Sequence, residues 1–190
     1  MLSAKMGAHR FLWDLHDAPL NTTPAYPIAA VYGNTVPEAT APWVMPGAYT
    51  VELTVNGQII KQSLTVKMDP RVKTTMTALQ DQRDYSVICY QNRIKAAQYI
   101  DAINAYKKLH PDVSREITQQ LTAFVGAVSK RRGSDNKDSS FGSLISGFDA
   151  VLHTLQEADL PPTGQAIAAV KKLTRDFQEL AQKWLAFEKK

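Results

Sequence analysis

The chain has 190 residues, of which 44% are hydrophobic and 21% are charged, and its formal net charge is +4. This composition is typical of a folded chain with a core, and the mixed charges do not predict a nucleic-acid-binding surface. The single cysteine, Cys89, excludes an internal disulfide and a zinc site built from several cysteines.

The sequence shows neither of two common targeting segments. No apolar run approaches the length of about 18 residues that would predict a membrane span. Residues 1–15, MLSAKMGAHRFLWDL, lack the apolar stretch and the small-residue cleavage site of a signal peptide. The chain by itself therefore predicts no localisation.

The first third of the chain predicts short strands. Residues 10–16 place Phe11, Trp13 and Leu15 on one face, which indicates a strand. Prolines and a glycine punctuate residues 17–46, which predicts a long loop with a short strand at 28–31.

A hairpin is the strongest local prediction. Residues 49–55 alternate apolar and polar side chains, and residues 59–68 form the returning strand. Asn56-Gly57 lies between them and predicts a type I′ turn, because both central residues of that turn need a positive φ.

Two or three strands bury little surface and leave their edges open, so the predicted sheet needs a second layer. Its open edge predicts pairing with another segment or with a second copy of the chain. We expect the core of this half to contain Phe11, Trp13, Tyr49, Val51, Leu53, Leu64 and Val66.

After Asp69-Pro70 the apolar period changes from 2 to 3.6, which predicts helices. Four segments are expected: about 75–109, a second that begins near 112 or 114 and reaches 128, a third from about 140, and a fourth after an N-cap at Thr163. A polar loop separates the second and third at 133–138. The sequence predicts an α+β chain, with a partial β-domain at 1–71 and an up-and-down antiparallel bundle at 72–190.

Motifs that carry chemistry are missing from the sequence. It contains no GxSxG, GxxxxGK[ST], GxGxxG or HExxH pattern. His9 and His16 would face opposite sides of a strand, which disfavours a metal site. Asp14 and Glu52 could form a glycosidase pair, but a backbone-binding Asp and a solvated Glu are the favoured interpretation. We therefore predict no catalytic residue, metal or cofactor.

Aromatic residues offer one alternative. Trp13, Trp43 and Tyr49 could form a sugar-stacking platform, although aromatic residues at strand spacing lie more often in a core. Trp43 and Tyr32, both in the 17–46 loop, are the candidate contacts for a carbohydrate.

Three stretches carry a family resemblance: GAHRFLWDL, PWVMPGAYTVELTVNGQIIKQSLTVKMDPRV and, before the last helix, ADLPPT. They resemble the region that follows BNR/Asp-box β-propellers in bacterial proteins described as sortilin-like or glycosyl hydrolase-like. The β part also resembles the Ig-like domain of flagellar hook-capping proteins.

The resemblance implies a partial Ig-like β-sandwich at the C-terminal end of an exported protein, periplasmic or secreted. The Asp-box pattern SxDxGxxW and the strands that precede GxxRFxWD in the family are missing from this sequence. No catalytic residue is therefore carried over, and the propeller and the missing Ig-like strands become expected partners.

Three functions stay open, in order of preference. The first is a non-catalytic accessory or protein-interaction region of a propeller protein. The second is a carbohydrate-binding module of a glycoside hydrolase, using Trp43. The third is a hydrolase in its own right, which would need two carboxylates converging in a pocket.

Overall fold

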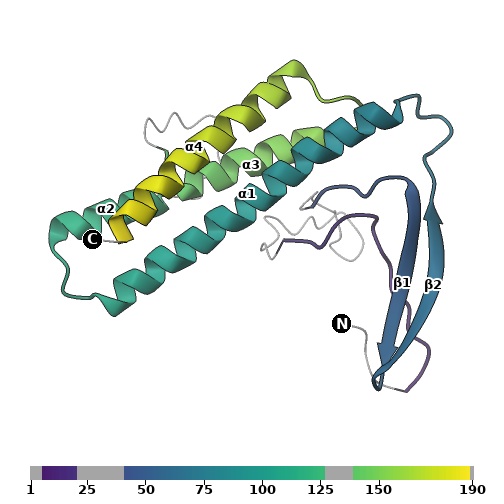
Figure 1. Cartoon of the computed structure of the whole chain (residues 1–190), viewed down its shortest axis with the longest axis horizontal. Helices are drawn as coiled ribbons and strands as arrows, with labels where there is room; N and C mark the ends of the chain where they lie inside the picture. The colour runs from purple at the N-terminus through teal and green to yellow at the C-terminus, as the bar shows by residue number, and fades with distance from the viewer. Residues whose placement is uncertain (1–5, 21–40, 127–138, 189–190) are drawn as a thin grey trace, which may run out of the picture.

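The computed structural model describes residues 6–20, 41–126 and 139–188. Within these ranges a two-stranded antiparallel hairpin precedes four helices, which confirms the α+β class (Figure 1). The hairpin projects from one end of the helical bundle, where the first helix begins. None of the described helices combines the length and the apolar character that a membrane span requires.

The hairpin forms as the sequence predicts. Strands β1 (Gly47–Val55) and β2 (Gln58–Val66) pair along nine residues each, from Gly47 opposite Val66 to Val55 opposite Gln58. Asn56 and Gly57 have φ values of 50° and 80°, which are the left-handed values of a type I′ turn.

The helices are α1 (Met76–Leu109), α2 (Arg115–Val125), α3 (Phe141–Gln156) and α4 (Gly164–Glu188). A hydroxyl caps each start, because the side-chain oxygen accepts a backbone N–H that has no partner within the helix. Thr163 does this for α4, as predicted, at 3.2 Å from the nitrogen of Ala166. The other three caps are Thr75, Ser114 and Ser140.

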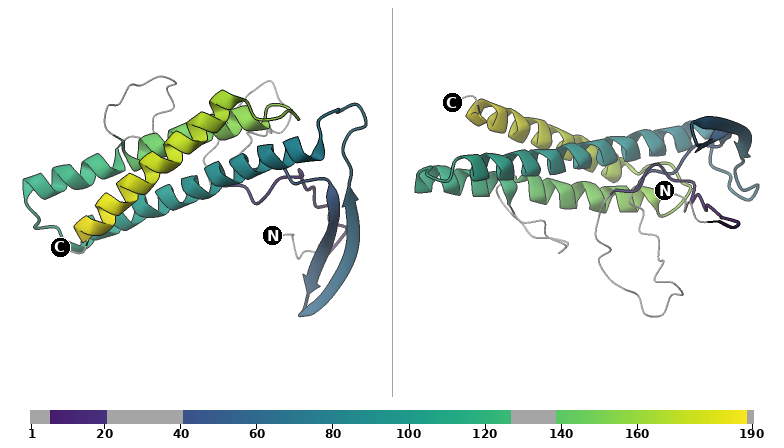
Figure 2. Two further views of the ribbon diagram at one scale, coloured as in Figure 1. Left: turned by 45° about the horizontal axis from the view of Figure 1, so that its top comes forward. Right: turned by 90° about the horizontal axis from the view of Figure 1, so that it is seen from below.

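The four helices make three legs rather than four, which corrects the simple up-and-down expectation. α1 has 34 residues and is about 51 Å long. α2 and α3 follow one another along the returning leg, and α4 then runs parallel to α1 (Figures 1 and 2). Neither α2 nor α3 alone matches the length of α1, so together they form one broken leg.

The core lies along the seam where α3 and α4 pack on α1. The largest fully buried side chains of this seam come from all four helices: Trp184, Phe141, Phe148, Ile103, Leu121, Leu152 and Val170. Close approach of α3 and α4 depends on Gly147, where an added Cβ would lie 2.7 Å from Leu173 Cδ2. The bundle is therefore a tightly packed unit.

The predicted strand at 10–16 is wrong. This segment makes one isolated bridge, His16 with Trp43, and is otherwise irregular. Leu15 has a φ of 62°, which turns the backbone out of the extended conformation and breaks the alternation that the prediction assumed. The described residues show two strands and no full Ig-like sandwich. The predicted strand at 28–31, Val128 and the loop at 133–138 lie outside them.

The predicted core of the β half is also wrong. Phe11 is 72% exposed and Val51 is 51% exposed, and Leu53 and Leu64 are exposed as well. Trp13, Tyr49 and Val66 are half-buried. The physical reason is that a two-stranded ribbon buries an apolar face only when a second layer covers it.

We expect Gly126→Ala to destabilise the bundle by about 1–3 kcal/mol. Gly126 ends α2 with a φ of 59°, and a Cβ there would lie 2.0 Å from Ser140 Oγ at the start of α3. The control is Gly164→Ala, where a Cβ meets open space and should stabilise by about 0.4–1 kcal/mol. Urea midpoints measure both, and equal midpoints for the two variants would contradict the expectation.

Candidate functional site

The most distinctive surface of the molecule is one face of the hairpin. The register places apolar residues of β1 opposite β2 on this face, with Tyr49 facing Leu64 and Leu53 facing Ile60. We call it the apolar face. It comprises Tyr49, Val51, Leu53, Val55, Ile60, Leu64 and Val66, together with two polar residues, Gln62 opposite Val51 and Gln58 opposite Val55. Five of these side chains are exposed: Val51, Leu53, Val55, Ile60 and Leu64.

The opposite face of the hairpin is mainly polar, although Ala48 and the exposed Ile59 also lie on it. Thr50 faces Ser63, and Glu52 faces Lys61 with 3.1 Å between Oε2 and Nζ. Such exposed cross-strand pairs contribute only tenths of a kcal/mol, yet they show which face is suited to water. The hairpin is therefore amphipathic, and its two faces suit different environments.

One segment of the chain approaches the apolar face. Residues 6–14 pass the hairpin on one side (Figures 1 and 2), and the rings of Trp13 and Tyr49 meet edge to face at 5.5 Å. The hydroxyl of Tyr49 donates to the carbonyl of Met45. Phe11 and Leu12 on the same segment are 72% and 83% exposed. The segment thus runs along the hairpin, contacts Tyr49 through Trp13 and brings exposed apolar side chains of its own.

Where the hairpin joins the bundle, two segments of the chain, 15–17 and 42–44, pair as a short antiparallel ladder, and we call this end of the hairpin its root. The N–H of Val44 donates to the carbonyl of Leu15 at 2.8 Å, and that of Asp17 to Pro42 at 2.9 Å. Between these bonds the rings of His16 and Trp43 stack with 3.7 Å between centroids. The segments 15–17 and 42–44 are thereby held side by side.

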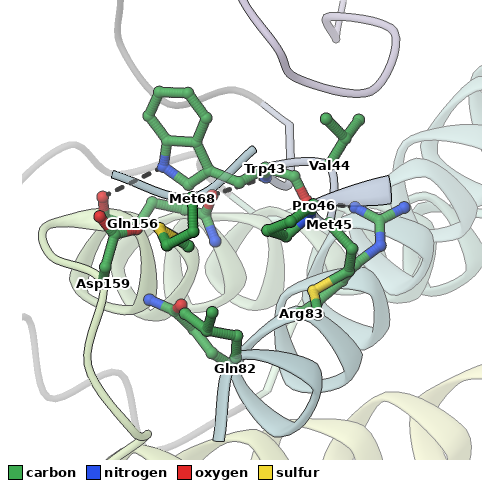
Figure 3. Close-up of a pocket in the computed structure, with 10 residues that line it drawn as sticks. Trp43, Val44, Met45, Pro46, Met68, Gln82, Arg83, Gln156 and Asp159 are labelled. Atoms are coloured by element: carbon green, nitrogen blue, oxygen red, sulfur yellow. Dashed lines mark hydrogen bonds between the residues drawn. The ribbon is translucent and has the colours of Figure 1, made fainter. Parts of the chain in front are cut away.

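A buried amide network attaches this ladder to the bundle (Figure 3). The side chain of Gln156, at the end of α3, accepts from the N–H of Trp43 at 2.8 Å and donates to Ser86 Oγ on α1 at 2.7 Å. Gln82, one turn before Ser86, donates to the carbonyls of Leu155 and Ala158. Gln156 therefore joins the ladder to α1, while Gln82 holds the end of α3, which carries Gln156, against α1.

Charged and hydroxyl groups complete the attachment from α1. Arg83 donates to both carboxylate oxygens of Asp17 at 3.0 and 3.1 Å and also to the carbonyl of Trp43. The hydroxyl of Tyr90 donates to the carbonyl of Ala18 at 2.8 Å. The first half of α1 therefore bonds both segments of the ladder.

Sequence reasoning missed this anchorage. Gln82 and Ser86 lie on the same helical stripe as Leu79 and Cys89, and all four are buried. Polar residues in an apolar stripe are the signal that could have indicated buried partners. The partners of Gln82 and Ser86 at the end of α3 lie 70 to 76 positions away in the sequence, which no local pattern reveals.

The structure describes one of the two residues predicted to contact a carbohydrate. Tyr32 lies outside the described residues. Trp43 is 41% exposed and borders an open hollow of about 300 Å³, counting the solvent at its mouth. Met45, Met68 and Leu79 also line the hollow, and its lining contains no second aromatic side chain. The polar groups of Gln156 and Arg83 in its wall are already engaged in the anchorage.

The two carboxylates considered for catalysis do not line that hollow. Asp14 accepts from the N–H of His16 at 3.1 Å, and Glu52 pairs with Lys61 on the polar face. Among residues 6–20, 41–126 and 139–188, no three His, Cys, Asp or Glu side chains form a group that could hold a metal.

Cys89 belongs to the core of the bundle. Its side chain is fully buried, and burial, with a smaller effect from the charge of Asp149, raises the pKa of the thiol from 9.0 to about 12. A nucleophilic cysteine needs the opposite, an accessible thiol with a lowered pKa.

Comparison with known proteins adds no relative: no family model, curated protein or solved structure matches the chain. The candidate site therefore depends on the geometry of this chain alone.

We expect Cys89 to resist thiol reagents in the folded chain. At pH 8 a pKa of about 12 instead of 9.0 lowers the thiolate fraction on the order of a thousandfold, and burial adds a steric barrier. Ellman's reagent should react slowly with the native chain and fast in 6–8 M urea, which serves as the control. Fast native labelling would show that the thiol is accessible.

We expect Gln156→Leu to destabilise the chain by about 1–3 kcal/mol, because the N–H of Trp43 and the hydroxyl of Ser86 would both lose a buried partner. Amide exchange at Trp43 should accelerate as well. The control is Gln98→Leu on the exposed side of α1, which should stay within about 0.5 kcal/mol of wild type. Unchanged exchange at Trp43 would contradict the role of Gln156.

Proposed function

We propose that this chain is a non-catalytic interaction module, the C-terminal accessory region of an exported β-propeller protein. In this proposal the apolar face of the hairpin holds β-strands from the region that precedes the chain in that parent. The family resemblance in the sequence suggests the parent, and the geometry of the hairpin suggests the kind of contact.

The single observation that carries the proposal is the exposed apolar face. Val51, Leu53 and Ile60 are 51%, 43% and 59% exposed on a ribbon whose other face is mainly polar, with Ile59 as its exposed large apolar side chain. Burying such a side chain fully contributes about 1.5–3 kcal/mol, so covering the face would contribute substantially to binding. Clustered apolar exposure on one face marks an interaction surface, whereas scattered exposure does not.

A β-layer fits this face better than a helix or a small ligand does. The face is only two strands wide, and neighbouring strands lie about 4.8 Å apart, so the contact stays narrow unless more strands widen it. The segment 6–14 already lies beside the hairpin, with Trp13 against Tyr49 and with Phe11 and Leu12 exposed. Strands placed beside that segment would cover the hairpin and these two side chains together.

The alternative, a carbohydrate-binding module, is favoured by one observation, the half-exposed indole of Trp43. Its ring stacks on His16, its N–H groups face Gln156, and the hollow beside it lacks a second ring. Sugar sites usually combine an aromatic platform with available polar groups. The hairpin therefore gives the stronger functional argument.

The proposal is tested with the region encoded upstream of Met1 in the same reading frame. We expect a β-propeller with Asp-box repeats there, and we expect it to bind this chain when the two parts are produced separately. Val51→Thr with Val55→Thr should weaken that binding about tenfold or more, because two hydroxyls would be buried without partners. Isothermal titration calorimetry measures the affinity.

The matched control exchanges the same residue types on the polar face, Thr50→Val with Thr54→Val, and should bind as wild type does. A stop codon immediately upstream, or equal affinities for the two double variants, would overturn the proposal. Binding of a glucan or chitin oligosaccharide that is lost in Trp43→Ala would favour the alternative function.

A further inference from the structure

The segment that precedes the ladder is bounded by two residues with a positive φ. Gly7 has a φ of 132° and Leu15 a φ of 62°, and residues 8–14 between them form neither helix nor strand. We call residues 8–14 the strap. Leu15 accepts the N–H of Val44 in the ladder, and from there the strap runs along the hairpin (Figures 1 and 2). The strap therefore starts from a fixed point at the root.

The strap already touches the apolar face at one place. The rings of Trp13 and Tyr49 meet edge to face at 5.5 Å, and both side chains are half-buried. Two residues farther from the ladder, Phe11 is 72% exposed. Two residues farther along β1, Val51 is 51% exposed. Two neighbouring apolar surfaces of one chain thus both face water.

The spacing of the residues suits a longer contact between these two surfaces. In an extended segment alternate side chains share a side, so Phe11 lies on the side of Trp13 and Leu12 lies on the other. One residue advances about 3.3 Å along an extended strap and along β1 alike. With Trp13 on Tyr49, an extended strap therefore brings Phe11 level with Val51.

We infer that the strap closes over the apolar face, with Phe11 packed onto Val51 and Leu53. Closure extends the observed contact of Trp13 by one side chain and removes apolar surface of both segments from water. The occupant belongs to the same chain, so closure needs no association between molecules and its effective concentration is high. The inference goes beyond the proposed function and does not depend on it, because it concerns the free chain.

Closure of the strap affects both the stability and the accessibility of the hairpin. A two-stranded hairpin without a second layer is marginally stable in water. The strap supplies part of such a layer, so Phe11 stabilises the pairing of β1 with β2. A partner that binds the apolar face has to displace Phe11, and the strap thereby controls access to this face.

The test is amide exchange in the full chain labelled with ¹⁵N. The two-residue turn makes Val55 and Gln58 a hydrogen-bonded pair, and such pairs recur at every second residue of an antiparallel ladder. The N–H groups of Val51 and Leu53 therefore bond to β2. We expect Phe11→Ser to accelerate the exchange of these two amides about tenfold, because the hairpin loses its cover and opens more often.

The matched control is Leu12→Ser, which removes a neighbouring side chain that is 83% exposed on the other side of the strap. It should change the exchange of Val51 and Leu53 by less than about twofold. Phe11→Leu should keep the protection, because leucine still fills the contact. In the unmodified chain, nuclear Overhauser effects should join the ring of Phe11 to the methyl groups of Val51.

Each contrary result overturns the inference. Equal exchange in Phe11→Ser and Leu12→Ser, or a missing Overhauser effect between Phe11 and Val51, would show that the strap stays open. Protection that is lost on dilution, together with dimers in light scattering, would make a second copy the cover of the face. The proposed function is judged separately by the variants at Val51 and Val55, so either proposal can fail alone.

Discussion

The seam between α1 and α3 is the contact on which the rest of the molecule depends. It buries Phe141, Phe148 and Leu152 against the long helix, and α4 closes it with Trp184. The same two helices provide the anchorage of the β region, since Ser86 lies on α1 and Gln156 lies on α3. The hairpin lies beyond the end of this seam at which α1 begins.

The anchorage and the apolar face have different physical characters. The anchorage is polar and largely buried, because Gln156 and Arg83 bond the ladder directly and Gln82 holds the end of α3 against α1. The apolar face, in contrast, is exposed to solvent. A hairpin held firmly at its root and uncovered along its length is suited to present a surface to a partner, which connects the packing of the bundle to the proposed function.

Local structure followed closely from the sequence. The hairpin, its turn at Asn56-Gly57 and the start of α4 after Thr163 all depend on contacts within a few residues, and all were predicted. The prediction of a strand at 10–16 was wrong because Leu15 adopts a left-handed backbone conformation, which the alternation of apolar and polar neighbours does not indicate. The expected β core failed because alternation shows which side chains share a face, but not whether anything covers that face.

The sequence by itself determined the α+β class, the hairpin and the four helices, because periodicity, turn residues and caps act over short distances. Only the tertiary structure decided that α2 and α3 share one leg, that Gln156 joins Trp43 to Ser86, and that the apolar face of the hairpin remains exposed. These features depend on which distant segments meet. That choice follows from the packing of the whole chain, and a local stretch such as the stripe of Gln82 and Ser86 can indicate that a partner exists but not which segment supplies it.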